Sequence, residues 1–316
     1  SGGNVGNINI HDYDEPLAQL TNNGTINNID IGAGLDISNS NLGIGIINNG
    51  TISTAQEGVS IGDASVVASF VNNGDITSSE SLALQVVGKS SVGSFLNAGN
   101  IISNSVNNPA VIFRYHNIDH GVVVYNDITN TGTIRAYGAG DAVRVDFNAA
   151  VGGSIINSGI MRGGNSGLVI YNAEIDNAIT NNGILYGEAE HGLVVTQTTI
   201  VDGDITNSGT ILGGTHGISI DEQALVNGKI YNNGGIAAIN SAINIDNEAV
   251  VNRIENHGSI LAGSNGIKIA NSAIVNEGIF NYGTITSADK AIYVEFASSA
   301  DINTYSGSEI NGDVDA

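Results

Sequence analysis

The chain has 316 residues, of which 43 are glycine and 2 are proline, and it contains no cysteine and no tryptophan. Its net charge of −22 at pH 7 disfavours binding to nucleic acid and to anionic membranes, and the missing cysteines exclude disulfides, thiolate metal sites and cysteine nucleophiles. No apolar run approaches the roughly 18 residues that a membrane-spanning helix needs, so we expect no membrane insertion by this segment.

A short motif, Asn-Asn-Gly-Thr-Ile at residues 22–26, recurs with small changes along the chain. Its copies follow one another at a nearly constant interval, except for one longer step between Gly99 and Gly132. In the first eleven of the twelve copies an apolar residue stands four positions before the glycine, asparagine two before it, and another apolar residue two after it; the last copy slips by one residue. The motif glycines are Gly24, Gly50, Gly74, Gly99, Gly132, Gly159, Gly183, Gly209, Gly234, Gly258, Gly283 and Gly307.

The rest of each unit contains further short apolar patterns. Eight to ten residues after the motif glycine, a small residue precedes an alternating apolar pair, as in Gly217 with Ile218 and Ile220, and another apolar residue follows near position sixteen, as in Leu225. Period-two alternation over short β-branched runs predicts strands and not helices. Three such strands per turn predict an all-β chain: a single parallel β-helix (a β-solenoid) of about 12 turns and roughly 25 residues per turn, occupying residues 1–316. The usual crossover preference makes it right-handed.

Residues at equivalent positions in this fold should stack on one another from turn to turn. Ile205, Ile230 and Ile254 are therefore predicted to form one buried file of apolar side chains. The asparagine column should lie at a strand corner, with its amides bonded to the next turn or to the backbone of the bend. The glycine that follows would supply a positive φ or the room for a tight bend. We interpret the Asn-Gly column as architectural.

Repeats such as Ile205-Thr-Asn-Ser-Gly-Thr-Ile211 and Ile46-Ile-Asn-Asn-Gly-Thr-Ile52 resemble those of the β-helical passenger domains of Gram-negative autotransporter adhesins. The acidic, cysteine-free composition, rich in Gly, Asn, Ser and Thr, is similar too. The resemblance covers nearly the whole chain and implies a right-handed β-helix. It also implies an extracellular protein at the bacterial cell surface, exported across the outer membrane, that acts as an adhesin or a self-associating factor.

The longer step between Gly99 and Gly132 marks a loop insertion within residues 104–127, the least repetitive part of the chain. Arg135 and Arg162 share the third position after their glycines, so they are predicted to be outward-facing neighbours on adjacent turns, with Tyr186 one turn further on. A cationic, tyrosine-rich island on an acidic rod would suit an acidic sugar or a protein carboxylate. The alternative is an elaborated loop whose arginines offset local acidic repulsion. The candidate binding residues are Arg114, Tyr115, His116, Arg135, Tyr137, Arg144, Arg162 and Tyr186.

Two further pairs of residues invite a metal-binding interpretation. His191 and His216 are one repeat apart and should stack on consecutive turns, but no third ligand is evident, so we interpret them as corner residues. Asp221 and Asp246 align across one turn on the outer face of a strand, which makes them a weak Ca²⁺ candidate. Apart from that ion we expect no cofactor.

Polysaccharide lyases and hydrolases are also built on this fold, so an enzyme has to be considered. Uronate elimination requires a base, which Arg114, His116 or His120 could supply. However, the uniform turns leave little chain for a cleft, and the adjacent aspartate pair typical of pectin-hydrolysing β-helix enzymes does not occur.

We therefore predict a non-enzymatic extracellular surface protein that acts in adhesion or self-association. Its partners would be other copies of itself, or a host or cell-surface glycan or protein. Two alternatives stay open: a subunit that forms filaments head to tail, and a polysaccharide lyase on a β-helix scaffold.

Overall fold

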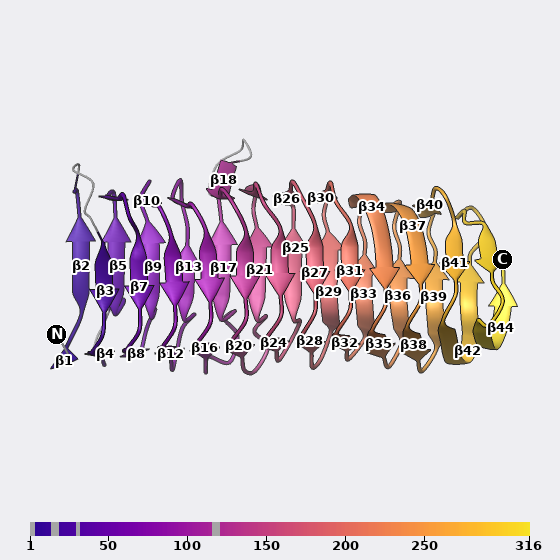
Figure 1. The fold of residues 1–316 in the computed structure, drawn as a ribbon, viewed down its shortest axis with the longest axis horizontal. Coiled ribbons are helices and arrows are strands. Elements are labelled where there is room, and N and C mark those ends of the chain that lie inside the picture. Colours follow the sequence, from indigo (N-terminus) through magenta and orange to yellow (C-terminus); the bar gives the residue numbers. More distant parts are fainter. Residues whose placement is uncertain (1–3, 14–18, 30–31, 116–120) are drawn as a thin grey trace.

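The computed structural model describes residues 4–13, 19–29, 32–115 and 121–316. The chain winds into one elongated solenoid whose strands lie across the long axis, with the first and last turns at opposite ends (Figure 1). Strands pair in parallel with their equivalents in the next turn, in sheets of 24 and 20 strands. The described residues form no helix, and therefore none that is long and apolar enough to cross a membrane. The predicted all-β parallel β-helix of about 12 turns, each roughly as long as the sequence repeat, is confirmed.

A turn carries four strand segments, one more than predicted. The apolar residue near position sixteen belongs to a short strand of its own, which a bend such as residues 202–204 separates from the strand that ends at the motif asparagine. We number the rows from the motif. First-row strands end at the asparagine, or at Thr304 in the last turn: β3(Leu20–Asn22), β7(Ile46–Asn48), β11(Phe70–Asn72), β15(Phe95–Asn97), β19(Ile128–Asn130), β23(Ile155–Asn157), β27(Ile179–Asn181), β31(Ile205–Asn207), β41(Ile279–Asn281) and β43(Ile302–Thr304). Second-row strands follow the glycine corner: β1(Asn4–Val5), β4(Thr25–Asn28), β8(Thr51–Thr54), β12(Asp75–Ser78), β16(Asn100–Ser103), β20(Thr133–Ala136), β24(Ile160–Gly163), β28(Ile184–Gly187), β32(Thr210–Gly213), β35(Gly235–Ala238) and β38(Ser259–Ala262).

The other two rows complete each turn. Third-row strands are β2(Ile8–His11), β5(Leu35–Ser38), β9(Val59–Gly62), β13(Leu84–Val86), β17(Val111–Arg114), β21(Val143–Asp146), β25(Leu168–Tyr171), β29(His191–Thr196), β33(His216–Ile220), β36(Ser241–Ile245) and β39(Asn265–Ile269). Fourth-row strands are β6(Asn41–Leu42), β10(Val66–Val67), β14(Ser91–Val92), β18(Gly121–Val124), β22(Ala149–Val151), β26(Glu174–Ile175), β30(Ile200–Val201) and β40(Ile274–Val275). Four long strands near the C-terminus run through a bend or across two rows: β34(Leu225–Asn232), β37(Val250–Asn256), β42(Thr284–Val294) and β44(Glu309–Asp315).

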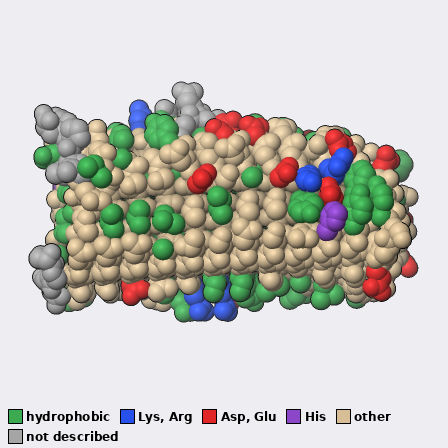
Figure 2. All heavy atoms as spheres, viewed as in Figure 1, with side chains coloured by type: hydrophobic (Ala, Val, Ile, Leu, Met, Phe, Trp, Pro, Cys, Tyr) green, Lys and Arg blue, Asp and Glu red, His purple; other side chains and the backbone are tan. Residues whose placement is uncertain are grey.

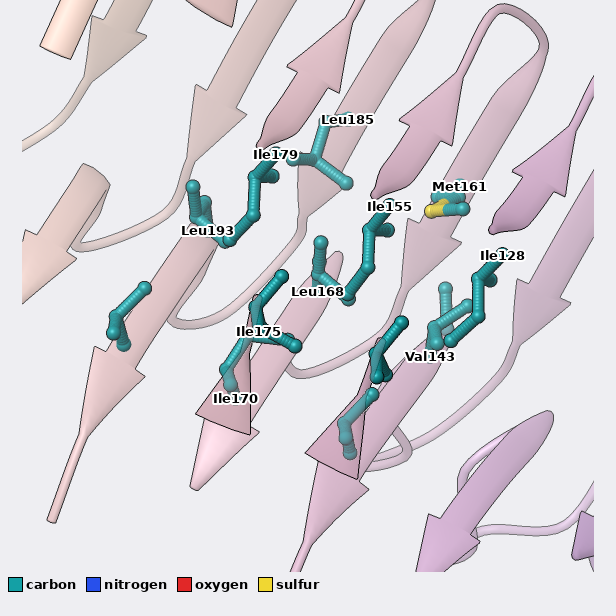
Figure 3. Close-up of a cluster of buried hydrophobic side chains, with 14 of the residues drawn as sticks. Ile128, Val143, Ile155, Met161, Leu168, Ile170, Ile175, Ile179, Leu185 and Leu193 are labelled. Atoms are coloured by element: carbon teal, nitrogen blue, oxygen red, sulfur yellow. The ribbon is translucent and has the colours of Figure 1, made fainter. Parts of the chain in front are cut away.

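The interior is filled by stacked files of apolar side chains. Ile205 pairs with Ile230, and Ile230 with Ile254, and each of the three is 1% exposed, so the predicted file is confirmed. Figure 3 shows the same arrangement nearer the middle of the rod, where Ile155 and Ile179 project from consecutive first-row strands into the core. Burying such files stabilises the fold by about 25 cal/mol per Å² of apolar surface.

The motif asparagines form a continuous ladder inside the corner between the first and second rows. The Nδ2 of each one donates to the Oδ1 of the next, at 2.7 to 2.8 Å. Each amide also donates to backbone carbonyls of the bend: Asn181 Nδ2 lies 3.2 Å from the Gly183 oxygen and 3.1 Å from the Thr210 oxygen of the next turn. The members are Asn22, Asn48, Asn72, Asn97, Asn130, Asn157, Asn181, Asn207, Asn232, Asn256 and Asn281.

The glycine of the motif is required for close approach between turns. Gly183 does not have a positive φ. A Cβ added to Gly183 would lie 2.0 Å from the carbonyl oxygen of Gly159 in the preceding turn. Of the two roles predicted for this column, room at the bend is therefore the one that Gly183 fulfils.

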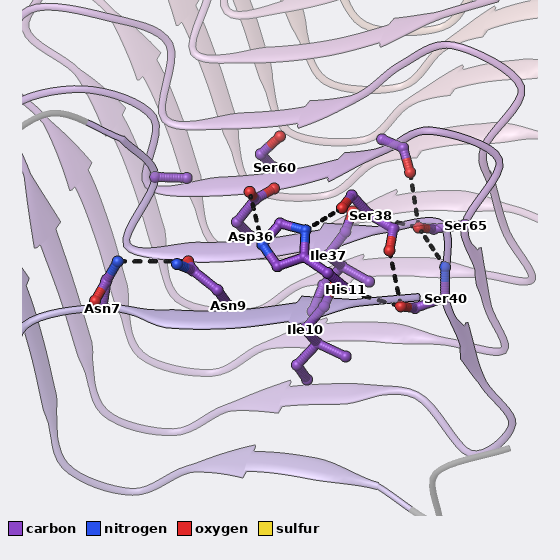
Figure 4. Close-up of polar contacts among 12 residues, drawn as sticks. Asn7, Asn9, Ile10, His11, Asp36, Ile37, Ser38, Ser40, Ser60 and Ser65 are labelled. Carbon is purple, nitrogen blue, oxygen red and sulfur yellow. Dashed lines mark hydrogen bonds and ion pairs between the residues drawn. The ribbon is translucent and has the colours of Figure 1, made fainter. Parts of the chain in front are cut away.

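A second polar column lies at the corner between the third and fourth rows in the N-terminal turns. The backbone N–H of Ser40 donates to the Oγ of Ser65 at 3.1 Å, and that of Ser65 to the Oγ of Ser90 at 3.1 Å (Figure 4). Nearby, His11 contacts Ser38 and lies 3.7 Å from a carboxylate oxygen of Asp36. Buried hydroxyls thus satisfy backbone groups that the sharp corner removes from the strand ladders.

The extra length of the longer step is spread over three connections. The connection from Ser103 to Val111 is slightly longer than the one between the paired positions of the preceding turn. The connection from Phe113 to Val124 is nearly twice as long as its equivalent, and that from Val124 to Ile128 is again slightly longer. Most of the insertion within 104–127 thus falls between the third and fourth rows, around residues 116–120, which lie outside the described part of the chain.

Candidate functional site

Arg135, Arg162 and Tyr186 lie side by side on the outside of the second row. Arg135 pairs with Arg162 across β20 and β24, and Arg162 pairs with Tyr186 across β24 and β28. Each alternates with an inward apolar residue of its strand, as the period of two requires. The prediction that these three are outward-facing neighbours on successive turns is confirmed.

Both arginines lie over tyrosine rings. The Cζ of Arg135 is 3.9 Å from the ring centroid of Tyr137, and that of Arg162 is 5.2 Å from the ring centroid of Tyr186. The Nε of Arg162 also donates to Glu188 at 2.6 Å. Within the described ranges Arg135 forms no ion pair, and its Nε is buried without a hydrogen-bond partner. Arg135 is therefore a cation held in place by a ring and not neutralised by a neighbouring carboxylate.

Arg114 and Arg144 lie elsewhere, on third-row strands β17 and β21, and both bind the same buried carboxylate. Arg114 donates to both oxygens of Asp146 at 2.8 Å, and Arg144 donates to Asp146 at 2.7 Å and to Asp141 at 3.2 Å. The Asp146 side chain is fully buried. For these two arginines the geometry matches the alternative interpretation, in which they offset acidic charge, and a guanidinium held this way is poorly placed to act as the base of an elimination.

Tyr115 and His116 complete the predicted set. Tyr115 is partly buried and packs against the core, with its ring above Gly121, where an added Cβ would come within 2.1 Å of the ring. It is thus turned inward and away from a surface island. His116, like His120, lies outside the described residues.

The second-row outer face continues past the tyrosines as an apolar strip, which our sequence reasoning missed. Leu212 and Leu261 flank the small Ala237 in register, and beside them lies a groove of about 490 Å³ whose lining runs from Tyr186 to Gly263 and includes Ile239. Leu261 and Ile239 are 52% and 75% exposed. We define the second-row outer face as Thr133, Arg135, Ile160, Arg162, Ile184, Tyr186, Thr210, Leu212, Gly235, Ala237, Ser259 and Leu261.

None of these twelve outward positions holds a carboxylate, although the chain has 31 acidic residues; Glu188, beside the face, lines the groove and is paired with Arg162. The only charged residues of the face are Arg135 and Arg162. The signal was available in the sequence, because apolar residues repeat at the first and third positions after the glycine, as in Ile160, Ile184 and Leu212. The pattern was missed because only the charged and aromatic residues of this row were considered.

A column of stacked rings near the C-terminus was also missed. The ring centroids of His257 and Tyr282 are 4.4 Å apart, and those of Tyr282 and Tyr305 are 4.1 Å apart. Beside them Lys229 and His257 both contact Glu255, and Figure 2 shows a histidine with basic and acidic side chains around it toward this end of the rod. Because the rings cover one another's faces and the charges are paired, we interpret the column as packing between turns.

His191 and His216 stack as predicted. Their ring centroids are 5.4 Å apart with an interplanar angle of 11°, and their strands are in register. Burial and the neighbouring His191 lower the pKa of His216 to about 4, and burial lowers the pKa of His191 as well. Both imidazoles are therefore uncharged at neutral pH.

The Ca²⁺ candidates already have hydrogen-bond partners. Asp246 accepts from Lys268 at 3.0 Å and from Asn271 at 2.5 Å, and Asp221 accepts from Asn247 at 2.7 Å. Burial acts to raise the pKa of Asp246, but these hydrogen bonds outweigh it and the pKa is lowered. No group of three or more potential metal ligands occurs among the described residues, and binding of Ca²⁺ stays a prediction.

No protein family, no curated protein and no solved structure matches the chain. The resemblance to autotransporter passengers therefore depends on the repeat and the composition, and the function has to be argued from the surface.

Proposed function

We propose that the chain is a non-enzymatic protein of the bacterial cell surface, exported across the outer membrane, that adheres or self-associates through the second-row outer face. The observation that carries the proposal is the absence of carboxylates from this face on a chain of net charge −22. Where acidic side chains dominate the surface, two copies of the chain repel each other. Here exposed leucine and isoleucine stand beside two arginines, a composition typical of contact surfaces.

The order of residues along the third position after the glycine makes the face self-complementary. It runs Arg135, Arg162, Tyr186, Leu212, Ala237, Leu261 from turn to turn. In an antiparallel pair with a two-fold axis between Tyr186 and Leu212, Tyr186 of one copy meets Leu212 of the other. The arginines then meet Ala237 and Leu261 instead of each other.

The size of the face favours a weak contact that gains strength in arrays. Six turns at about 4.8 Å span only about 24 Å along the rod, and the face is two side-chain columns wide. A strip of this length and width covers an area well below the roughly 800 Å² that each partner buries in a stable interface. Many copies on one cell surface would compensate, because linked weak contacts add up to high avidity.

The test is the double variant Leu212→Glu, Leu261→Glu. We expect it to abolish the concentration-dependent association of the wild type in sedimentation velocity, and to reduce clumping and attachment of bacteria that display the chain. The control is Leu96→Glu, which makes the same leucine-to-glutamate change once, at an outward position of the first row. A double variant that associates and attaches as the wild type does would contradict the proposal.

A further inference from the structure

Arg135 lacks an ion-pair partner on a chain that has carboxylates in excess. The sequence has 9 basic and 31 acidic residues. Seven of the basic residues form an ion pair with a carboxylate, and among the described residues only Arg135 and Lys89 do not. Lys89 is exposed in a turn, where water surrounds it. Arg135 is partly buried and lies over the ring of Tyr137, so the chain holds this cation in place without neutralising it.

The guanidinium of Arg135 has donors that face solvent. Its side chain makes no hydrogen bond to the described residues, and of its three nitrogens only Nε is buried. The two terminal nitrogens are therefore free to donate to an outside acceptor, and a carboxylate accepts from such a pair bidentately. The ring of Tyr137 fixes the guanidinium before anything binds, which lowers the entropic cost of binding. Arg135 is thus a preformed site for one carboxylate.

The positive stretch around Arg135 is short. Arg162 follows it in register, but its charge is paired with that of Glu188. In the other direction the register neighbours are Ile102 and then Thr77, which are uncharged. A uronate polymer carries a carboxylate on every unit, so its further units would lie over Glu188 or over uncharged side chains. One uncompensated positive charge therefore suits a single acidic group better than a polyanion.

The apolar groove on the same face begins one turn past the second arginine. Its lining starts at Tyr186 and combines the large side chains of Leu212, Leu261 and Ile239 with glycine and alanine residues. Glu188 is the one carboxylate in this lining, and it already has its ion pair. A volume of about 490 Å³ leaves room for apolar side chains of a partner. The face thus offers one acid-binding end and one apolar end.

The strand spacing sets the distance between these two ends. Neighbouring strands lie about 4.8 Å apart, so Leu212 is about 14 Å and Ala237 about 19 Å from Arg135 along the rod. An extended peptide advances about 3.3 Å per residue. A segment laid along the rod with its first residue at Arg135 therefore has its fifth residue over Leu212 and its seventh over Ala237. These three side chains lie on one face of the segment, because side chains of an extended chain alternate.

We propose that the second-row outer face binds an extended segment of another protein, with a carboxylate of the segment on Arg135 and its apolar side chains in the groove. The inference rests on the function proposed above, since it names the partner that this face takes in adhesion. Polysaccharides have no large apolar side chains for the groove. The twelve positions of the same face on a second copy supply no carboxylate, so self-association leaves Arg135 without a partner.

The experiment pans a phage-displayed library of random dodecapeptides against the immobilised full chain. We expect the enriched sequences to carry Asp or Glu, with Leu, Ile, Phe or Tyr four and six positions away. Arg135→Glu reverses the charge of the acid-binding end and should replace the enriched acidic residue with Lys or Arg. The control is Lys89→Glu, which makes the same charge change at the other unpaired base and should leave the enriched sequences as they are.

A synthetic copy of the most enriched peptide then gives affinities by isothermal titration calorimetry. Replacing its acidic residue with the corresponding amide should weaken binding to the wild type at least tenfold, and should not change binding to Arg135→Gln. Circular dichroism shows whether each variant is folded. Enrichment without an acidic residue, the same acidic sequences on folded Arg135→Glu, an equal loss on Arg135→Gln, or tighter binding of hexagalacturonate than of the peptide would each overturn the inference.

The two proposals for this face fail separately. The titration is carried out at a chain concentration at which sedimentation velocity shows a monomer, so its result does not depend on self-association. Conversely, the sedimentation and attachment tests of Leu212→Glu, Leu261→Glu do not depend on an acidic partner residue. Loss of the acid preference with those tests passed would contradict only the inference drawn from Arg135.

Discussion

The side-chain amide of Asn181 donates to that of Asn207 at 2.8 Å, and the same contact joins each pair of turns in the ladder. Asn181 also accepts from Asn157 at 2.8 Å and is 2% exposed. Its amide thus links three consecutive turns while it bonds the carbonyls of the bend. The ladder thus joins consecutive turns through side-chain hydrogen bonds, as the strands join them through backbone hydrogen bonds.

Replacing Asn181 with alanine should therefore destabilise the fold by about 1–3 kcal/mol, because the buried amides on either side and the carbonyls of the bend lose a partner. Urea unfolding measures the change. The neighbouring Asn182 is exposed, and Asn182→Ala should change stability by no more than about 0.5 kcal/mol. Equal effects at the two positions would show that the ladder contributes nothing.

The second prediction tests whether the motif glycines are needed because neighbouring turns approach each other closely, and not because of their backbone conformation. Gly183→Ala places a methyl group 2.0 Å from the Gly159 oxygen, so the turns must move apart, at a cost of about 1–3 kcal/mol. Gly235→Ala is the matched control, because nothing lies within 4 Å of an added Cβ there. Thermal unfolding of both variants tests this, and tolerance of alanine at Gly183 would contradict the packing argument.

The sequence was sufficient for the fold because its repeat encodes the packing directly. Like residues recur once per turn, so the file through Ile205, Ile230 and Ile254 and the pairing of Arg135 with Arg162 followed from counting. The fourth strand segment was missed because a bend within a turn leaves only a weak local pattern. The repeat also does not show whether an outward side chain has an ion-pair partner. Arg144 and Arg135 look alike in sequence, but only Arg144 has Asp146 beside it.

The third prediction concerns that carboxylate. Asp146 is fully buried between Arg114 and Arg144, so Asp146→Asn leaves Arg114 without its counter-charge and Arg144 with Asp141 alone. We expect a loss of about 3–5 kcal/mol, the range found when one partner of a buried ion pair is removed. Denaturant unfolding measures it. Asp75→Asn, at an exposed position of the second row, is the control and should be close to neutral.

The last prediction concerns the two stacked histidines and the dependence of stability on pH. The pKa of His216 is about 4 in the folded chain and near 6.5 in an unfolded one, and the pKa of His191 is lowered too. Between these values the unfolded state binds more protons, so the free energy of unfolding rises with pH. The full stability is present above about pH 6.5 and is lost progressively as the pH falls toward 4.

His216→Gln removes one of the titrating groups, while the surrounding His191, Lys268 and Asp246 remain. Urea unfolding at a series of pH values from 4 to 7 should therefore give a shallower slope for the variant than for the wild type, by up to one proton per molecule. Aspartates and glutamates with lowered pKa, such as Asp246, lose their contribution mainly below this window, because their unfolded pKa lies near 4. A variant with the slope of the wild type between pH 4.5 and 6.5 would show that His216 takes up its proton in the folded chain, with a pKa close to the unfolded value.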